Sequence, residues 1–486
     1  MGESQATLFQ PNFNRSVHVE ARADRVTADA GALLIRELVE RSGLRQQLEK
    51  ALVDTRAPER TTHPFMELLL TWLLQDVQGY PDQLDVSLLR DDPLFRLSVS
   101  SRRGERALLP ARGREPDGLA SQPTMSRTLT MLSTEDNRSG LGEVLAASGD
   151  VLRLRAKTER VLDLDSLPIE VHGEQPGSAY NGHFRMRCFH PLVLRSAEGF
   201  FLAARLREGT AHTATGALAF ALPVLREEAH KAHRLWLRID AGFPETEFLR
   251  TLEQEGILYV ARLRRNQALE RLAELYLEQA AEDWPARGEV RLHELRYRAG
   301  KWQQERRVVL VILERCSDQG ELFIDHFFLL TNADAADESA EDLLARYRAR
   351  GSAEKDFGEW QNTLAVRLSS VPRPKRHYRD VPIAMPVVRH DSFAANEARL
   401  LLSLLAANVM HAATVLLARR SKERWSRARF RALVLKTSAR VIRGSRTVLI
   451  VIDAARAQLW KQLWRELARH YPVRGSPARR ALPGRA

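Results

Sequence analysis

The chain has 486 residues, of which 44% are apolar, so it is long enough for two or more packed domains and too apolar to be disordered. Lysine and arginine exceed aspartate and glutamate by 74 to 62, and the net charge of +12 indicates either a polyanionic partner such as nucleic acid or simply a basic soluble protein. The only two cysteines, Cys188 and Cys316, are far apart, which argues against a disulfide scaffold or a cysteine zinc site and fits a reducing cytoplasm.

Residues 1–157 are predicted to form a mainly helical N-terminal region. The first residues lack a basic stretch followed by an apolar run, so we expect no secretory signal. Amphipathic patterns predict helices over 26–56 and 64–76, and a further helical stretch ends near residue 157. Residues 100–122 are rich in glycine, proline and arginine, which predicts a mobile linker.

At about residue 158 the pattern changes to alternating strands and helices. Short apolar runs separated by turn residues are typical of strands. The predicted order is a strand, a hairpin, a helix, a strand, a helix and a strand, at 160–165, 185–208, 215–232, 234–240, 245–256 and 257–265. Three further strands are predicted within 289–332.

A helix with an unusual polar stripe follows this strand-rich interval. Ser339 and Asp342 can cap its start. Tyr347, Arg350 and Glu354 lie on one helical face, where a core-facing stripe would be apolar. The stripe is therefore either a solvated face or part of a charged site, and a glycine beside it leaves open whether there is one helix or two.

The C-terminal third is basic around one apolar segment. Residues 371–380 form a basic, proline-rich loop, and 419–431 are rich in arginine. Residues 400–418 are long and apolar enough to question as a membrane span, but polar residues interrupt them, which favours a buried helix. The basic tail after residue 473 is expected to be disordered.

Three carboxylates occupy positions that suggest a metal site. Asp165 ends the first predicted strand, Asp240 ends the fourth, and Glu354 lies on the polar stripe. The first two meet at one sheet edge if their strands are neighbours, and carboxylates without thiolates suit Mg²⁺ or Mn²⁺. Taken singly, Asp165 can cap a turn, Asp240 can form an Asx turn and Glu354 can be a surface residue, while Asp163 competes with Asp165 for the same role.

Several stretches carry a family likeness. The longest is LDLDSLPIEVHGEQPGSAYNGHFRMRCFHPLVL at 162–194, joined by RIDAGF at 238–243 and YRARGSAEKDFGEW at 347–360. ARADRVTADAGALLIREL, LRDDPLF and LASQPTMSR add to it. Over roughly residues 12–470 the sequence resembles the DDE transposases of the IS1380 group, within the larger IS4-like set.

The resemblance implies an α/β fold with a ribonuclease H-like catalytic core, a β-rich insertion, and helical N-terminal and C-terminal regions. The implied segments are a DNA-end-binding region with its linker at 1–157, the first part of the core at 158–265, the insertion at 266–336, the second part of the core at 337–418, and a basic helical region with a disordered tail at 419–486.

The resemblance also implies roles for the carboxylates and the polar stripe. Asp165, Asp240 and Glu354 would bind catalytic Mg²⁺, for which Mn²⁺ can substitute. Tyr347 and Arg350 would belong to a Y-x-x-R-x-x-x-E-x-x-x-x-x-x-K motif whose polar groups contact DNA phosphates near the cut. The last position of that motif is Gln361 in this sequence, which removes a cation.

The implied activity is cleavage of transposon ends by hydrolysis and joining of the 3′-hydroxyl to target DNA. The partners would be the terminal inverted repeats, target DNA and a second copy of the chain, in the bacterial cytoplasm. Further DNA contacts are predicted at Lys375 and Arg376 of the basic loop and at an exposed Trp302, which can instead cover a small sheet. Two alternatives stay open: a nuclease on the same fold without strand transfer, and an inactive DNA-binding remnant.

Overall fold

The structure is a computed structural model. It describes residues 7–14, 16–21, 25–102, 104–109, 118–155, 157–282, 290–316, 322–364, 367–371, 392–421, 423–444 and 447–472. Lys375, Arg376, most of the basic loop, the middle of the predicted linker and the predicted tail lie outside these residues.

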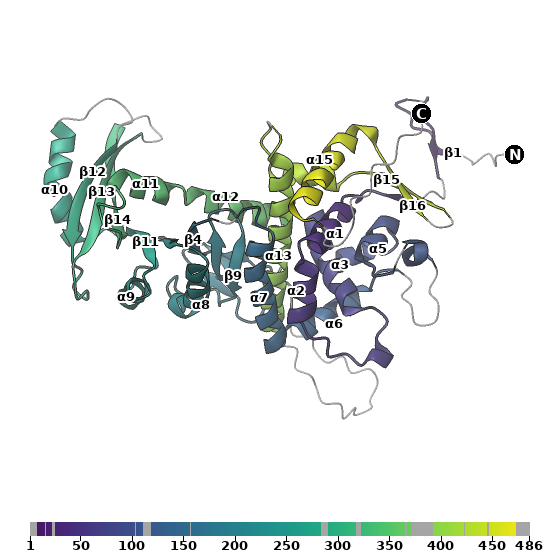
Figure 1. The fold of residues 1–486 in the computed structure, drawn as a ribbon, viewed down its shortest axis with the longest axis horizontal. Helices are drawn as coiled ribbons and strands as arrows, with labels where there is room; N and C mark the ends of the chain where they lie inside the picture. Colours follow the sequence, from purple (N-terminus) through teal and green to yellow (C-terminus); the bar gives the residue numbers. More distant parts are fainter. Residues whose placement is uncertain are drawn as a thin grey trace. The chain divides into compact units, whose positions relative to one another are not determined.

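The chain separates into two compact units, each built from non-contiguous segments (Figure 1). The first unit comprises Met1–Arg41, Arg56–Met125 and Ala413–Ala486. The second comprises Ser42–Thr55 and Ser126–Ala412. The five segment boundaries expected from the sequence remain a prediction.

The second unit contains a mixed sheet of eight strands in the order β12-β13-β14-β11-β10-β4-β8-β9. Strand β10 is parallel to both β4 and β11, and the remaining neighbours are antiparallel. The strands are β4 Glu159–Ser166, β8 Leu192–Ser196, β9 Phe201–Arg205, β10 Arg234–Ile239, β11 Leu258–Leu263, β12 Val290–Tyr297, β13 Arg306–Cys316 and β14 Leu322–Thr331.

Helices cover both faces of this sheet. They are α7 Glu135–Val151, α8 Ala217–His230, α9 Thr246–Gln254, α10 Gln267–Glu282, α11 Ala340–Arg348, α12 Gly351–Glu359 and α13 Ser392–Ala418, with a π-helical turn at Trp360–Leu364. Successive side chains of a strand point to opposite faces. On β4, Arg160 contacts Glu228 of α8, whereas Asp163 faces the side on which Trp236 packs against Leu343 of α11.

The strands predicted at 160–165, 234–240 and 257–265 and the three within 289–332 are present. The last three do not form a separate sheet, because β14 pairs with β11 and extends the central sheet. The hairpin predicted over 185–208 is more divided than expected. β8 and β9 pair around Gly199, whose φ of +98° suits glycine, while β7 Met186–Phe189 lies in a small sheet with β5 Ile169–Glu170 and β6 Ala179–Asn181.

One helix prediction needs correction at a glycine, and one open question is answered. The single helix expected over 26–56 is wrong, because Gly43 has a φ of +81° and separates α1 Ala32–Arg41 from α2 Leu44–Ala51. The polar stripe is divided between α11 and α12, which answers the question left open by its glycine. The predicted cap is present, since the Asp342 N–H donates to Ser339 Oγ at 3.1 Å.

The first unit is helical with a small antiparallel sheet. Its helix α3 Phe65–Gln78 confirms the prediction at 64–76. The strands β15 and β16 interrupt a region that was expected to be helical, because their alternating apolar residues pack on one face only. The unit's elements are β1 Thr7–Phe9, β2 Val19–Glu20, β3 Val26–Thr27, α1, α3, α4 Val86–Leu89, α5 Pro93–Val99, α14 Arg427–Phe430, a π-helical turn at Arg431–Leu435, β15 Ala439–Arg443, β16 Val448–Ile452 and α15 Ala454–His470, with α6 Gln122–Leu132 and α13 crossing between the units and short 3₁₀ turns at Pro58–Arg60, Gln83–Asp85 and Gly104–Leu108.

Helix α13 contains the apolar segment that was questioned as a membrane span. By length and composition alone it is the one such helix among the described residues, with a mean hydropathy of 2.0. Within the fold, 89% of its most apolar window is buried by other parts of the protein. The helix therefore has the burial expected of a core helix, as the sequence predicted.

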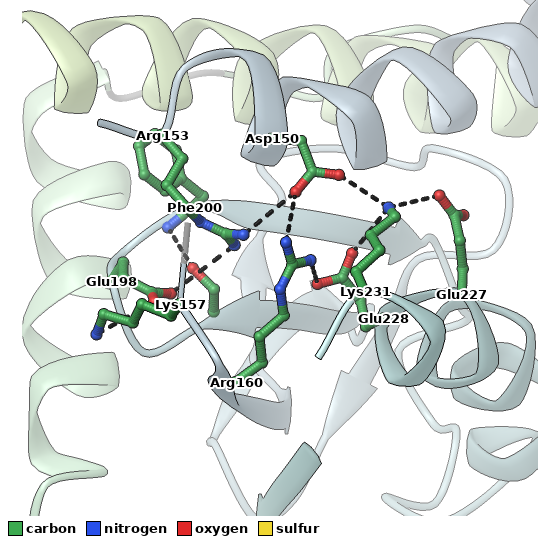
Figure 2. A network of polar contacts seen from close by, with 10 residues as sticks. Asp150, Arg153, Lys157, Arg160, Glu198, Phe200, Glu227, Glu228 and Lys231 are labelled. Atoms are coloured by element: carbon green, nitrogen blue, oxygen red, sulfur yellow. Dashed lines mark hydrogen bonds and ion pairs between the residues drawn. The ribbon is translucent and has the colours of Figure 1, made fainter. Parts of the chain in front are cut away.

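A network of charges ties α7, β4 and α8 together on one face of the sheet (Figure 2). Arg160 on β4 is ion-paired with Glu228 and, at 3.1 Å, with Asp150 of α7. Lys231 lies 2.8 Å from Asp150 and 3.1 Å from Glu228. Arg160 and Glu228 are buried, so their charges depend on each other for solvation.

Replacing Glu228 with glutamine should destabilise the second unit, because it leaves a buried guanidinium with one carboxylate fewer. We expect Glu228→Gln to lower the free energy of unfolding by about 3 kcal/mol in chemical denaturation. The matched variant is Glu227→Gln. It removes an exposed carboxylate from the same helix, and that carboxylate also pairs with Lys231. That change should cost less than about 1 kcal/mol, and equal losses in both variants would contradict the importance of burial.

Candidate active site

Asp165 and Asp240 lie side by side at one edge of the central sheet. Strands β4 and β10 are parallel neighbours, and Leu164 is paired in register with Ile239. The next residue on each strand is the aspartate, so the two carboxylates occupy neighbouring positions where both strands end. The sequence made their meeting conditional on neighbouring strands, and the sheet meets that condition.

The Asp165 carboxylate is half-buried and is held by two donors. Its Oδ1 accepts a hydrogen bond of 2.9 Å from the Ser166 N–H, and its Oδ2 accepts one of 2.6 Å from Arg350 Nη2. The pKa of this carboxyl is raised to about 6, chiefly by burial and also by the nearby Asp240 and Asp163, while Arg350 and the Ser166 N–H oppose the rise. Loss of hydration is thus the main reason why the charged form of Asp165 is disfavoured.

Asp240 also makes the local turn that its sequence allows. Its Oδ1 accepts a hydrogen bond of 2.7 Å from the Gly242 N–H, which closes an Asx turn. Turn formation and a role beside Asp165 are therefore compatible, because a carboxylate has further lone pairs to offer.

Asp163, the competitor for the role of first ligand, is a buried structural residue. It is 0% exposed. Arg238 contacts it at 2.6 and 2.8 Å, and Arg195 contacts it at 3.1 Å. Its oxygens are committed to two guanidinium groups beneath the sheet edge, which favours Asp165 as the residue available to a ligand.

The residues of the polar stripe differ in how they lie relative to the two aspartates. Arg350 lies in the short break between α11 and α12 and is 9% exposed, with its guanidinium against Asp165. Burial raises the pKa of the Tyr347 hydroxyl, and Asp240 and Glu354 add to the rise while Arg350 and Arg262 oppose it. Glu354 is exposed on the first turn of α12.

The oxygen atoms of the site are of the type that a hard divalent cation prefers. Their arrangement meets only part of what such a cation requires. Asp165 and Asp240 supply carboxylate oxygens at one point, which Mg²⁺ and Mn²⁺ prefer. Within the described residues no group of three His, Cys, Asp or Glu side chains is close enough to hold a metal. Glu354 is therefore near Tyr347 but does not complete a three-donor site, and a cation, Arg350, stands against Asp165.

The remaining predicted DNA contacts have different outcomes. Gln361 is exposed and its Nε2 donates to the Pro168 carbonyl at 3.0 Å, just beyond the end of β4. The expectation of an exposed Trp302 is wrong, because the indole is 8% exposed and packs against Tyr297 and under Arg306. It covers the sheet, which was the alternative. Lys375 and Arg376 fall outside the described residues.

Sequence reasoning missed Arg207, which shapes the surroundings of Asp240. Its guanidinium donates to the carbonyls of His190, His212, Thr213 and Thr215 at 2.8–3.1 Å. Burial lowers its pKa to about 10. The loop it holds touches the turn after Asp240, where a Cβ on Gly242 would lie 2.7 Å from Thr213. No local pattern in the sequence pointed to this role.

Arg195 and Arg238 were also missed, although a signal exists for them. Both occupy strand positions that alternation directs inward, where apolar residues are expected. A charge at an inward position requires a partner of opposite sign. Asp163, in the stretch LDLDS, also lies at an inward strand position, and it is the ion-pair partner of both arginines.

Comparison with known proteins identifies the family of the chain. The family described as Transposase DDE domain group 1 matches residues 9–377, which include both aspartates, Arg350 and Glu354. Comparison with curated proteins finds no match.

The two neighbouring aspartates of β4 should have opposite effects on stability. The pKa of Asp165 is raised from 3.8 to about 6, so its contribution to stability is present below pH 3.8 and is lost as pH rises through 6. Asp165→Asn removes that ionisation cost. The free energy of unfolding of this variant minus that of the wild type should therefore increase by about 3 kcal/mol between pH 3 and pH 8.

Asp163→Asn is the matched variant on the same strand. It leaves two buried guanidinium groups with an uncharged partner, so it should lower the free energy of unfolding near neutral pH by about 3 kcal/mol. Chemical denaturation across pH measures both. A gain for Asp163→Asn, or a pH-independent effect of Asp165→Asn, would contradict these assignments.

Proposed function

Because the chain belongs to the Transposase DDE domain family, group 1, we propose that it cleaves the ends of a transposon and joins them to target DNA. The reaction would be a metal-dependent phosphoryl transfer. The observation that carries the proposal is the partly exposed Asp165–Asp240 pair at the ends of adjacent parallel strands, with Arg350 beside it.

The topology supports a ribonuclease H-like core. The strands β9, β8 and β4 form an antiparallel meander, and β10 and β11 continue the sheet in parallel from β4. Asp165 is the last residue but one of the first of these five strands in chain order, and Asp240 directly follows the fourth. The strands β12 to β14 would be the β-rich insertion of an IS4-like enzyme, and the assignment to the IS1380 group is based on the resemblance of residues 162–194.

Each polar residue of the site has a chemical task in this reaction. Asp165, Asp240 and Glu354 would hold Mg²⁺, or Mn²⁺ in its place, which supplies activation of the attacking oxygen and stabilisation of the leaving one. Arg350 presents parallel N–H donors that match a phosphate. The Tyr347 hydroxyl, which burial keeps protonated, can donate a hydrogen bond to the same phosphate.

The substrate would be DNA in the bacterial cytoplasm, namely terminal inverted repeats and a target site. The excess of 12 positive charges favours binding along a phosphate backbone. Two copies of the chain would bring two ends together. The basic residues Lys375 and Arg376 would add contacts to the backbone, which position DNA without reading its sequence.

One observation keeps a second function in view, an inactive remnant that only binds DNA. Gln361 replaces the lysine of the family motif, and its amide is engaged by the Pro168 carbonyl. A nuclease without strand transfer would use the same carboxylates. Joined products on a target duplex distinguish a transposase from both.

Neutralising any one of the three carboxylates should abolish chemistry while leaving DNA binding in place. We expect Asp165→Asn, Asp240→Asn and Glu354→Gln each to reduce nicking and joining by more than about 100-fold, beyond the loss caused by outer-shell changes. Affinity for end DNA without metal should stay close to that of the wild type. Nicking assays in Mg²⁺ and gel-shift titrations measure the two quantities.

The control is Asp337→Asn, which removes an exposed carboxylate before α11. It should leave both quantities unchanged. Full nicking activity in one of the three site variants would remove that residue from the metal site.

Restoring the motif's cation should strengthen the contact with DNA. Gln361→Lys should steepen the dependence of log affinity on log salt concentration by roughly 0.7–0.9, the value for one added phosphate contact, and should raise the nicking rate. Gln254→Lys adds the same charge at an exposed position of α9 and should do neither. A Gln361→Lys variant with an unchanged salt slope would place this residue away from the phosphate backbone.

A further inference from the structure

Four charged side chains form a connected network beneath the carboxylate edge. Arg238 contacts both oxygens of Asp163, at 2.6 and 2.8 Å. Arg195 contacts Asp163 at 3.1 Å with Nη1, and its Nη2 is ion-paired with Asp356. Three of the four are at most 2% exposed, and the side chain of Asp356 is 17% exposed.

The network joins the strands of the site to the helices of the polar stripe. Asp163, Arg195 and Arg238 come from β4, β8 and β10, and Asp356 comes from α12. Arg238 also donates at 3.0 Å to the carbonyl of Arg346, near the end of α11. The contacts of the network as a whole therefore reach both helices that flank Arg350.

Asp356 is placed to fix the rotation of α12 about its axis. Residues two apart on a helix point about 200° from each other, so Asp356 and Glu354 lie on opposite flanks. Ala353 and Phe357 fill the buried face between them. With Asp356 bound to Arg195, the helix cannot turn without breaking an ion pair, and the direction of Glu354 is set.

Buried ion networks are an expensive way to pack a helix on a sheet. Apolar side chains of similar volume would hold the same surfaces together without the desolvation of four charges. Charges, unlike apolar contacts, fix one rotational setting, because their hydrogen bonds are directional. The network is thus better suited to fixing the orientation of α12 than to holding the helix on the sheet.

We propose that Asp356, acting through Arg195 and Asp163, is a positioning residue that fixes the rotation of α12 and thereby sets the direction of Glu354 relative to the Asp165–Asp240 pair. The inference rests on the proposed function and deepens it, since it names the device that sets the third carboxylate. Asp356 touches neither DNA nor metal in this arrangement. Its loss acts through the helix.

The test is Asp356→Asn in the full-length chain, which keeps the shape of the side chain and removes its charge. We expect the Mg²⁺ concentration for half-maximal nicking to rise about tenfold, within the range for residues that support metal ligands. Calorimetry should show a similar weakening of Mn²⁺ binding. Affinity for end DNA without metal should not change, because the phosphate-binding residues are untouched.

Two further variants separate positioning from folding. Asp356→Glu keeps the charge and should recover part of the metal affinity, whereas a residue needed only for bulk would show no such rescue. Glu341→Gln removes an exposed carboxylate from α11 and should match the wild type in every measurement.

The outcomes distinguish this inference from the function on which it rests. If the wild type nicks DNA and Asp356→Asn shows the same metal dependence and Mn²⁺ affinity, the positioning role is wrong and the function stands. If the wild type binds Mn²⁺ without nicking DNA, the function is wrong, and the Mn²⁺ affinity of Asp356→Asn still decides the positioning role. A wild type that does neither overturns both.

Discussion

The bridge between Asp163 and its two arginines is the constraint on which the site depends. A carboxylate that is 0% exposed cannot stay ionised without partners, and Arg195 and Arg238 supply them from the two strands that flank β4. Because each arginine also reaches a helix, through Asp356 or the Arg346 carbonyl, solvation of one buried charge fixes three strands and two helices together. Arg350, which lies between these two helices, consequently contacts Asp165 at the sheet edge, whereas Glu354 is exposed.

At the sheet edge above this bridge, carboxylates outnumber the cations in contact with them. Asp165 and Asp240 crowd negative charge at the edge, with Arg350 as the cation in contact with Asp165. Ionisation of Asp165 lowers the stability of the fold, because the raised pKa means that the charged form is disfavoured in the folded state. The strand β4 thus carries two aspartates with opposite effects on stability. The ion pairs of Asp163 stabilise the fold, whereas ionisation of Asp165 destabilises it.

The architecture separates the tasks of the chain. The carboxylates, the polar stripe and the network all belong to the second unit, which is built mostly from the middle of the sequence. The first unit draws its helices and its three-stranded sheet from both ends of the chain, with β3 pairing with β15. The family match runs from residue 9 to 377 and so spans parts of both units.

The sequence by itself determined the local elements and the types of residue at their ends. Short apolar runs bounded by turn residues predicted β4, β10, β11 and the strands β12 to β14, and neighbouring residues predicted the cap at Ser339. Strand order, the break at Gly43, the burial of Trp302 and the partners of Asp163 came only with the tertiary structure. The reason is range: periodicity and capping act within a few residues, whereas the ion pairs of the network join residues 32, 75 and 161 positions apart, and packing alone selects such partners.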